Sequence, residues 1–452
     1  MRQTDSGNTT ASRRRIAVVG AGISGLSAAW LLSRNNDVVL YEADRRLGGH
    51  AHTVEAATPS GPVAVDTGFI VYNDRNYPNL VALFDHLRVP TLSSTMSFAA
   101  SLDGGAFEYS GSGISGMLGQ RSNVLRPRFW RMLSDILRFY RAAPALLSRA
   151  YMDDTTLGEY LDAAGYSSAL VEDHLLPMGA AIWSTTAQEM RAYPLKAFLR
   201  FFASHGLLSL SDRPQWRTVA GGSRAYVQRL AADFRGEIRL DCPVAAIVRD
   251  HGGVLITDSK GHSDRFCDVV VATHADQALA MLTDGDAAER SSLGAFQYTR
   301  NTAVLHSDTR LMPKRRKVWS SWNYIGDRAR DGERPLCVSY WMNMLQGLPE
   351  KEQVFVTLNP IRDIAAEKIY GSYAYAHPLF NHAALEAQTR LSNLQGRRNT
   401  WFCGAHFGSG FHEDGLQSGL AVAESLGGGK RPWTVENESG RIAYGDMRLA
   451  AE

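Results

Sequence analysis

The stretch from residue 13 to residue 54 constrains the fold of this chain more than any other. Residues 16–19 (Ile-Ala-Val-Val) form a short apolar run that is typical of a buried parallel strand. A glycine pattern, Gly-Ala-Gly-Ile-Ser-Gly, fills residues 20–25, and residues 26–41 then predict a helix and a second strand. Glu42 ends that strand. Together these features predict a dinucleotide-binding βαβ unit, the alternative being a glycine-rich turn in another α/β unit.

Each residue of the pattern has a physical role in such a unit. Gly20 permits the tight turn, Gly22 lets the backbone approach a pyrophosphate, and Gly25 lets helix and strand pack closely. Ser24 lies in the first helical turn, whose free N–H groups and positive dipole end favour phosphates. Glu42 is expected to accept hydrogen bonds from a ribose hydroxyl.

Residues 42–49 (Glu-Ala-Asp-Arg-Arg-Leu-Gly-Gly) resemble the segment that follows the second strand in the flavin amine oxidase superfamily. In that superfamily an arginine and two glycines wrap the pyrophosphate of FAD, and a second arginine usually follows. His50 stands at the place of that second arginine. Nicotinamide enzymes do not usually carry this loop, so the resemblance favours non-covalent FAD over NAD. It implies cofactor contacts from Ala43, Arg46, Gly48, Gly49 and His50.

Three later segments match places where flavoproteins of this type return to the cofactor. Residues 66–69 correspond to the segment in which the chain comes back to the flavin after the first loop, which implies contacts from Thr67 and Gly68. Val244 corresponds to a valine that lies beside the adenine. Residues 402–419 resemble the final flavin-binding loop and helix, whose N-terminus faces the side of the ring where negative charge gathers on reduction. The residues implied there are Gly404, Asp414, Gly415 and Ser418.

The same glycine pattern occurs again at residues 111–116. No continuous apolar strand precedes it, and no second strand ending in an acid follows, so we interpret it as a loop. The sequence therefore predicts a single dinucleotide site, which argues against a disulfide-reductase-type flavoprotein with a second nucleotide domain.

Composition restricts the remaining possibilities. The net charge of +2 gives no reason to expect a nucleic-acid partner, and no apolar run approaches the ~20 residues of a membrane span. Four cysteines are scattered without metal-ligand spacing, so we expect no metal site and a reduced, cytoplasmic protein. They are Cys242, Cys267, Cys337 and Cys403.

The resemblance implies an α/β fold in two discontinuous domains. The first is a Rossmann-like FAD-binding domain of the amine oxidase/glutathione-reductase type, built from residues 13–76, 213–275 and 396–430. The second is an α+β substrate domain of residues 77–212 and 276–395. Residues 1–12 and 431–452 are expected to be tails.

Residues 13–428 as a whole resemble bacterial NAD/FAD-binding, amine-oxidase-like proteins that are often grouped with cyclopropane fatty acid synthases. The segments that carry the resemblance include residues 177–183, 205–208, 213–224 and 340–343. Some members look like flavin-dependent desaturases of methyl-branched fatty acyl chains. The resemblance thus implies an FAD-dependent oxidoreductase that passes a hydride from an acyl-lipid substrate to flavin N5.

Two departures from the amine oxidase pattern favour carbon–carbon dehydrogenation. Asn301 stands where amine oxidases place a lysine that holds a water at the flavin, and Phe411 stands where they place a tyrosine. Two alternatives stay open: an oxidase of a small amine, and a non-catalytic flavin-bearing partner of a lipid methyltransferase or oxygenase.

An acid–base partner is expected near the flavin, and His406, His412 and Glu413 are the candidates, each of which could instead make a structural hydrogen bond. An enzyme acting on a phospholipid acyl chain is also expected to dock on the inner membrane surface. The arginine-rich region 126–149 and the basic run 314–317 could provide that docking, or they could be ordinary solvated faces.

Overall fold

The computed structural model describes residues 13–148, 154–208, 213–327 and 335–443. The predicted tail at residues 1–12 lies outside these ranges. One domain is built on a five-stranded parallel sheet whose central strands are buried apolar runs. Its order is β10 (Glu237–Arg239), β2 (Asp37–Tyr41), β1 (Arg15–Val19), β14 (Asp268–Val271) and β20 (Thr400–Phe402). The three stretches of sequence predicted for the FAD-binding domain thus supply adjacent strands.

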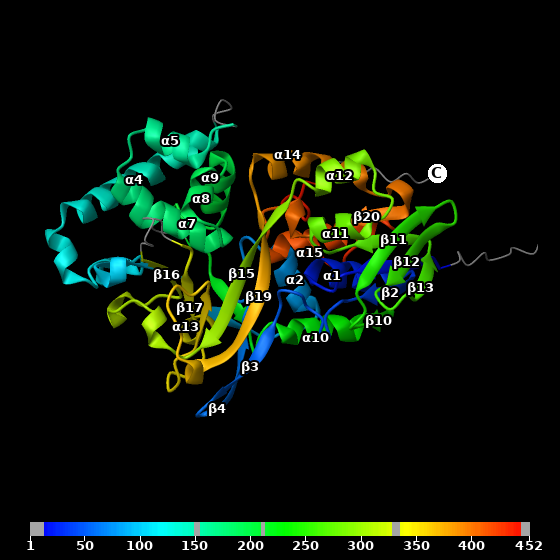
Figure 1. Ribbon diagram of the computed structural model, residues 1–452, viewed down its shortest axis with the longest axis horizontal. Helices are drawn as coiled ribbons and strands as arrows, with labels where there is room; N and C mark the ends of the chain where they lie inside the picture. Colours follow the sequence, from blue (N-terminus) through cyan, green and yellow to red (C-terminus); the bar gives the residue numbers. More distant parts are fainter. Residues whose placement is uncertain (1–12, 149–153, 209–212, 328–334, 444–452) are drawn as a thin grey trace, which may run out of the picture.

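Helices α1 (Ile23–Leu32) and α15 (His412–Ser425) lie together against this sheet (Figure 1). Glycine makes their close approach possible: a Cβ added at Gly419 would lie 2.2 Å from the carbonyl oxygen of Ser24. This contact brings the first and last helices of the domain together and so places both beside the carboxyl ends of β1 and β20. The domain also contains α2 (Pro78–His86), α10 (Arg224–Asp233) and the antiparallel strands β11 (Val244–Asp250), β12 (Gly253–Asp258) and β13 (Ser263–Phe266).

The other domain is built on a seven-stranded mixed sheet. Its order is β19 (Ile369–Leu379), β15 (Gln297–His306), β18 (Phe355–Leu358), β17 (Val338–Trp341), β16 (Trp322–Gly326), β7 (Phe98–Leu102) and β8 (Phe107–Ser110). The long β15–β19 pair crosses the middle of the molecule in Figure 1 and connects the two halves. The predicted α/β fold with a discontinuous substrate domain is confirmed.

A group of helices stands at one end of the long axis, next to this sheet (Figure 1). It comprises α3 (Gly113–Met117), α4 (Pro127–Leu147), α5 (Leu157–Ala163), α6 (Ser168–Leu170), α7 (Leu176–Trp183), α8 (Ala187–Arg191) and α9 (Leu195–Ser204). Pro144 lies inside α4, which continues beyond it to Leu147. The second glycine pattern is only partly the loop that was expected, because residues 113–116 lie within α3. The strand before it, β8, pairs with β7 in antiparallel fashion, so the pattern is not part of a parallel βαβ unit.

Shorter elements complete the fold. They are β3 (Thr53–Thr58) with β4 (Gly61–Asp66); β5 (Tyr72–Asn73), β6 (Thr91–Ser94) and β9 (Trp216–Val219); and α11 (Ala275–Met281), α12 (Ala287–Leu293), α13 (Met342–Gln346) and α14 (His382–Leu391). The four cysteines are free thiols. Within the described ranges, no helix combines the length and the apolar character that crossing a membrane requires.

The C-terminal segment corrects one expectation. Residues 431–443, here called the C-terminal strap, are not a mobile tail but pack against the nucleotide-binding domain. Arg431 is 4% exposed and pairs with Glu424 at 2.8 Å, and Trp433 stacks on Trp30. The strap ends with the backbone N–H of Ala443 donating to the carbonyl of Phe407 at 2.9 Å. Residues 444–452 lie outside the described part of the chain.

Candidate active site

The turn between β1 and α1 forms an open cradle of backbone groups. Gly20 has φ +98°, a value that side-chain-bearing residues rarely adopt. A Cβ at Gly22 would meet no atom within 4 Å, so the space above this residue is free for a ligand. Gly22 also pairs with Gly48 of the second loop, and no side chain caps the N-terminus of α1. The first N–H groups of α1 are therefore presented to the cavity beside two glycine turns.

Glu42 occupies the carboxyl end of β2, as the sequence predicted. Its carboxylate accepts hydrogen bonds from the backbone N–H of Ala21 at 2.7 Å and of Asp44 at 2.9 Å. These bonds hold the carboxylate at the edge of the cavity, where Val244 also lies. This arrangement provides a fixed acceptor for a ribose next to an apolar wall for a base.

One cavity of about 970 Å³ runs from this cradle to the helical end of the substrate domain. Most of the predicted cofactor residues line it: Gly20, Gly22, Ser24, Glu42, Ala43, Gly48, Gly49, His50, Thr67, Gly68, Val244 and Gly404. The candidates His406 and His412 line it as well. Segments more than 300 residues apart in the sequence therefore meet at one site.

Other predicted cofactor residues support the site without lining the cavity. A Cβ at Gly25 would lie 1.9 Å from the carbonyl oxygen of Gly20, and one at Gly415 would lie 2.8 Å from Ser24 Oγ, so both glycines serve close packing. Ser418 Oγ accepts the N–H of Gly404 at 2.9 Å and thereby fixes the loop after β20. Arg46 pairs with Asp44 at 3.2 Å and does not line the cavity.

Glu413 is not an acid–base group of this site, which corrects the prediction. Its buried carboxylate accepts the backbone N–H groups of Asn79 at 3.0 Å and Leu80 at 2.9 Å. It therefore caps the N-terminus of α2, a structural role that suits a negative charge at a helix start. Burial raises the pKa of this carboxyl, and hydrogen bonds from Gln417 and Asn79 oppose the rise.

Asp414 also differs from the expected direct flavin contact. Its carboxylate is fully buried, accepts the N–H groups of Ser409 at 3.1 Å and Phe411 at 2.8 Å, and pairs with Arg441 of the C-terminal strap at 2.7 Å. Ser409 and Phe411 line the cavity, whereas Asp414 does not. Asp414 thus holds the backbone of the final cavity loop by hydrogen bonds without lining the cavity itself.

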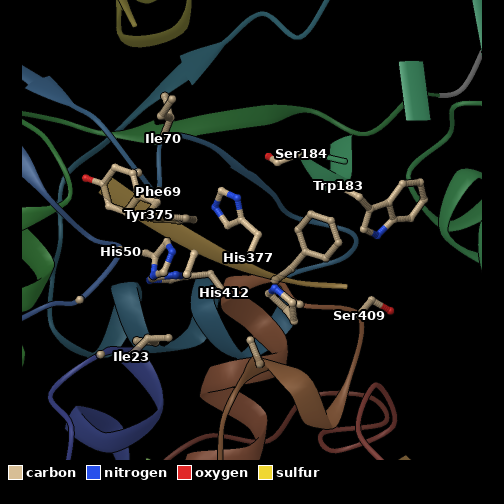
Figure 2. A pocket seen from close by; sticks show the side chains of 18 of the residues that line it. Ile23, His50, Phe69, Ile70, Trp183, Ser184, Tyr375, His377, Ser409 and His412 are labelled. Carbon is tan, nitrogen blue, oxygen red and sulfur yellow. The ribbon is translucent and has the colours of Figure 1, made fainter. Parts of the chain in front are cut away.

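Seven histidines line the cavity, and four of them were not predicted from the sequence: His174, His205, His274 and His377. His274 follows β14 and His377 lies on β19. The ring of His50 lies 5.5 Å from that of His377 and 6.2 Å from that of His274. Figure 2 shows His377 beside His50 and His412. The only available signal for His274 was its position just after a predicted strand of the nucleotide-binding sheet.

A chain of amides orients His377. The N–H of Thr302 donates to Asn359 Oδ1 at 2.9 Å, so the amide nitrogen of Asn359 faces Asn301 Oδ1 at 2.7 Å. Asn301 Nδ2 is then left to donate to His377 Nδ1 at 3.1 Å. Because Nδ1 accepts, the proton of the neutral ring is on Nε2. Asn301 does not line the cavity and acts on it through His377.

Burial keeps the imidazoles of all seven cavity histidines neutral near pH 7. Burial lowers the pKa of His174 to about 4 and that of His205 to about 3. Burial lowers the pKa of His377 to about 4 and the pKa values of His406 and His412 to about 3. Burial also lowers the pKa of His274, and burial with neighbouring histidines lowers that of His50 well below its usual value. The site is therefore an uncharged group of hydrogen-bonding rings.

The distal part of the cavity is mostly apolar, although His174, His205 and Arg213 also line the cavity. Phe411 stacks on Phe201 at 4.7 Å, and Trp183 packs on Phe201 at 4.8 Å. Beyond them the lining includes Met96, Phe98, Met117, Ile136, Tyr140, Met178, Ile182, Trp322 and Tyr340. Among the described residues that line the cavity, Glu42 is the single carboxylate, and it lies at the nucleotide end.

These features fit FAD. The open space over Gly22 suits a pyrophosphate, Glu42 suits a ribose, and Val244 suits an adenine. Farther along, Nε2 of His50 is buried without a hydrogen-bond partner among the described residues, which suits a polar edge of the flavin ring. The fold and site thus define a two-domain flavoprotein.

The chain belongs to the family described as flavin containing amine oxidoreductases, whose sequence model matches residues 23–426. FAD is accordingly the cofactor, and the class is that of FAD-dependent oxidoreductases. A protein of Mycobacterium tuberculosis named as a flavin-containing monoamine oxidase, AofH, is 26% identical over 55% of this chain and 54% of its own length. The chain thus spans about half the length of the curated relatives it matches.

Two solved structures show the same fold over nearly their whole length. A putrescine oxidase bound to putrescine has a TM-score of 0.64 at 13% identity, covering 92% of this chain and 99% of that one. A fatty acid isomerase of P. acnes that produces CLA has a TM-score of 0.59 at 17% identity, covering 91% and 98%.

Proposed function

We propose that this protein is an FAD-dependent dehydrogenase that desaturates an apolar acyl chain, such as that of a methyl-branched fatty acyl phospholipid. The observation that carries the proposal is the mostly apolar distal cavity, whose described lining includes the cation Arg213 but no carboxylate. Such a cavity suits a hydrocarbon chain, whereas an ammonium group placed there would lose its hydration without gaining a counter-charge. The fatty acid isomerase named above shares the fold, which is compatible with this proposal.

The residues of the chain divide the work between binding and proton transfer. Bound FAD supplies a hydride acceptor. The aromatic group of Phe201, Phe411 and Trp183 orients the acyl chain and excludes water. His377 offers an N–H donor at Nε2 and cannot take a proton there, so His406, which lines the cavity with an unpartnered Nε2, is the better candidate to receive the substrate proton.

Anaerobic titration tests the proposal. Adding a methyl-branched unsaturated phospholipid to the FAD-loaded protein should bleach the oxidised flavin absorbance, and a straight saturated phospholipid should not. His406→Gln should slow the bleaching while keeping the bound FAD, because it removes the proton acceptor but no part of the nucleotide cradle. Bleaching by simple amines without any response to lipid would refute the desaturase proposal.

Oxidation of a small amine is the second candidate, and family membership favours it. It requires a place for the amino group near the flavin, where Phe411, His377 and Tyr375 could form an uncharged cage. The same titration with a panel of amines tests it. A third outcome, no reduction by either class until a lipid methyltransferase or oxygenase is added, would support the role of a flavin-bearing partner.

A further inference from the structure

Exposed apolar side chains are concentrated at one end of the molecule. Of the nine large apolar side chains that are exposed in the described residues, five lie between residues 114 and 137. They are Ile114 (81% exposed), Val124, Leu125 (86%), Trp130 (52%) and Leu137. They come from α3, the 3-10 turn at Arg121–Leu125, and α4, which stand at the end of the long axis in Figure 1. Exposed apolar residues are normally scattered singly, so this cluster marks an interaction surface.

The outer face of α4 combines apolar and cationic side chains. Phe129, Ile136 and Phe139 are buried on its inner face, while Trp130 and Leu137 are exposed. Arg131, Arg138 and Arg141 are exposed beside them, and the first two pair with the buried Asp135 at 3.6 and 3.5 Å. The indole N–H of Trp130 donates to the carbonyl of Val124 at 2.9 Å, which holds the ring at the surface next to the exposed 3-10 turn. This mixture is typical of helices that lie in a membrane interface.

A basic hollow adjoins the apolar cluster. It has a volume of about 520 Å³, and its charged lining residues are Arg121, Arg315, Arg316 and Lys317. Arg315 pairs with the buried Glu108, whereas Arg121 and Lys317 have no carboxylate within ion-pair distance in the described part of the chain. Residues 109–134 contain four arginines and no acidic residue. The surface is therefore complementary to anionic groups.

The same elements reach the distal cavity from the other side. Met117 of α3 and Ile136 and Tyr140 of α4 line the cavity, while neighbouring residues of both helices are exposed. A layer one helix thick thus separates the apolar cavity from the apolar surface.

We propose that this surface, called the docking surface and defined as Ile114, residues 121–137 and residues 314–317, binds an anionic lipid bilayer. The apolar side chains enter the interface, and the basic hollow contacts lipid phosphates. A bilayer suits this surface better than a protein partner because apolar and cationic groups alternate over it, and its one acidic residue, Asp135, is 4% exposed and pairs with Arg131 and Arg138. The inference deepens the proposed function, because it gives a lipid substrate a route to the cavity, but docking itself does not require turnover.

Vesicle flotation with the FAD-loaded full chain tests the proposal. Saturated phosphatidylcholine vesicles with phosphatidylglycerol should carry the protein at low salt, and high salt or the omission of phosphatidylglycerol should reduce binding. Saturated lipids are used because they are not the proposed substrate. The pair Arg121→Glu and Lys317→Glu should weaken the partition about tenfold or more, because each reversal replaces attraction to the surface by repulsion. Lys260→Glu, an exposed charge reversal on the nucleotide-binding domain, is the matched control.

Insertion is tested separately from electrostatic attraction. Ile114→Asp with Leu125→Asp should abolish binding at every salt concentration, whereas Leu240→Asp, at an apolar residue that is 40% exposed outside the docking surface, should not. Brominated lipids should quench part of the tryptophan fluorescence, and Trp130→Phe should remove that part.

The proposal would be overturned if the wild-type protein did not bind anionic vesicles at low salt. It would also be overturned if Leu240→Asp reduced vesicle binding as much as Ile114→Asp with Leu125→Asp, or if the latter pair left binding intact. Flavin reduction by a detergent-dispersed lipid is measured on the same preparations. Reduction without docking refutes this inference alone, and docking without reduction refutes the proposed function alone.

Discussion

At the scale of single residues, the two glycines of the first turn have separable roles. A side chain at Gly22 has free space around it and would occupy the place of the cofactor. We therefore expect Gly22→Val to fold but to lose FAD, as measured by flavin absorbance after gel filtration and by thermal unfolding. Gly25→Val is the contrasting variant: its Cβ would overlap the carbonyl of Gly20, so we expect it to unfold. Retention of FAD by Gly22→Val would contradict the assigned cradle.

The orientation of His377 gives a second prediction at this scale. Asn301→Asp replaces the amide donor at His377 Nδ1 by a carboxylate that accepts, so the ring should move its proton from Nε2 to Nδ1. The negative charge should also raise the pKa of His377 above its value of about 4. Histidine ¹⁵N shifts measured against pH would show both effects, and Thr299→Ser, which changes a neighbour without this role, should show neither. An unchanged tautomer would contradict the amide chain.

At the scale of elements, the C-terminal strap holds the final cavity loop through Asp414 and Arg441. Removing one partner of a buried pair leaves a buried charge uncompensated and typically costs about 3–5 kcal/mol. Arg441→Ala should therefore lower the free energy of unfolding by about that amount and speed the loss of FAD, because Asp414 holds the N–H groups of Ser409 and Phe411. Arg441→Lys keeps the positive charge, so it should lower the free energy of unfolding by less than Arg441→Ala does. Urea unfolding measures the free energy of unfolding, and flavin absorbance followed over time measures the rate of FAD release. Equal stability of the wild-type protein and both variants would contradict the role of the C-terminal strap in holding the cavity loop.

At the scale of the whole molecule, the buried imidazoles make stability depend on pH. The pKa values of His377, His406 and His412 are lowered in the folded state, so below pH ~6.5 the unfolded chain binds more protons. Their stabilising contribution is thus present above pH ~6.5 and is lost as the pH falls towards 4, by about 1.4 kcal/mol per pH unit for each ring. Glu413, whose pKa burial raises, opposes this trend.

Urea unfolding of the FAD-loaded protein between pH 7 and pH 5 should show this loss. His406→Gln should flatten the slope, while His262→Gln, at a histidine whose side chain is 78% exposed, should not. A stability that rises on acidification would contradict the neutral state of the rings.

The sequence alone determined the nucleotide-binding half of this protein. The strand, glycine turn, helix, second strand and Glu42 are local features, and local propensity and spacing control how they fold. That is why the four cofactor residues predicted from this pattern, Gly20, Gly22, Ser24 and Glu42, line the cavity. Eight further lining residues were implied by the resemblance to flavin amine oxidases and not by the local pattern. The sequence named both His412 and Glu413 at the start of α15, and only His412 lines the cavity, whereas Glu413 caps α2, because neighbours on a helix point about 100° apart.

Only the tertiary structure decided the rest of the site. His50, His274 and His377 come from three distant segments, and the order of strands in two sheets brings their rings together. The pairing of Asp414 with Arg441 and the exposure of Leu125 likewise depend on which surfaces remain uncovered after packing. Such contacts arise from long-range topology, which hydrophobic periodicity along the chain does not encode, so motifs could locate the cofactor but not the chemistry around it.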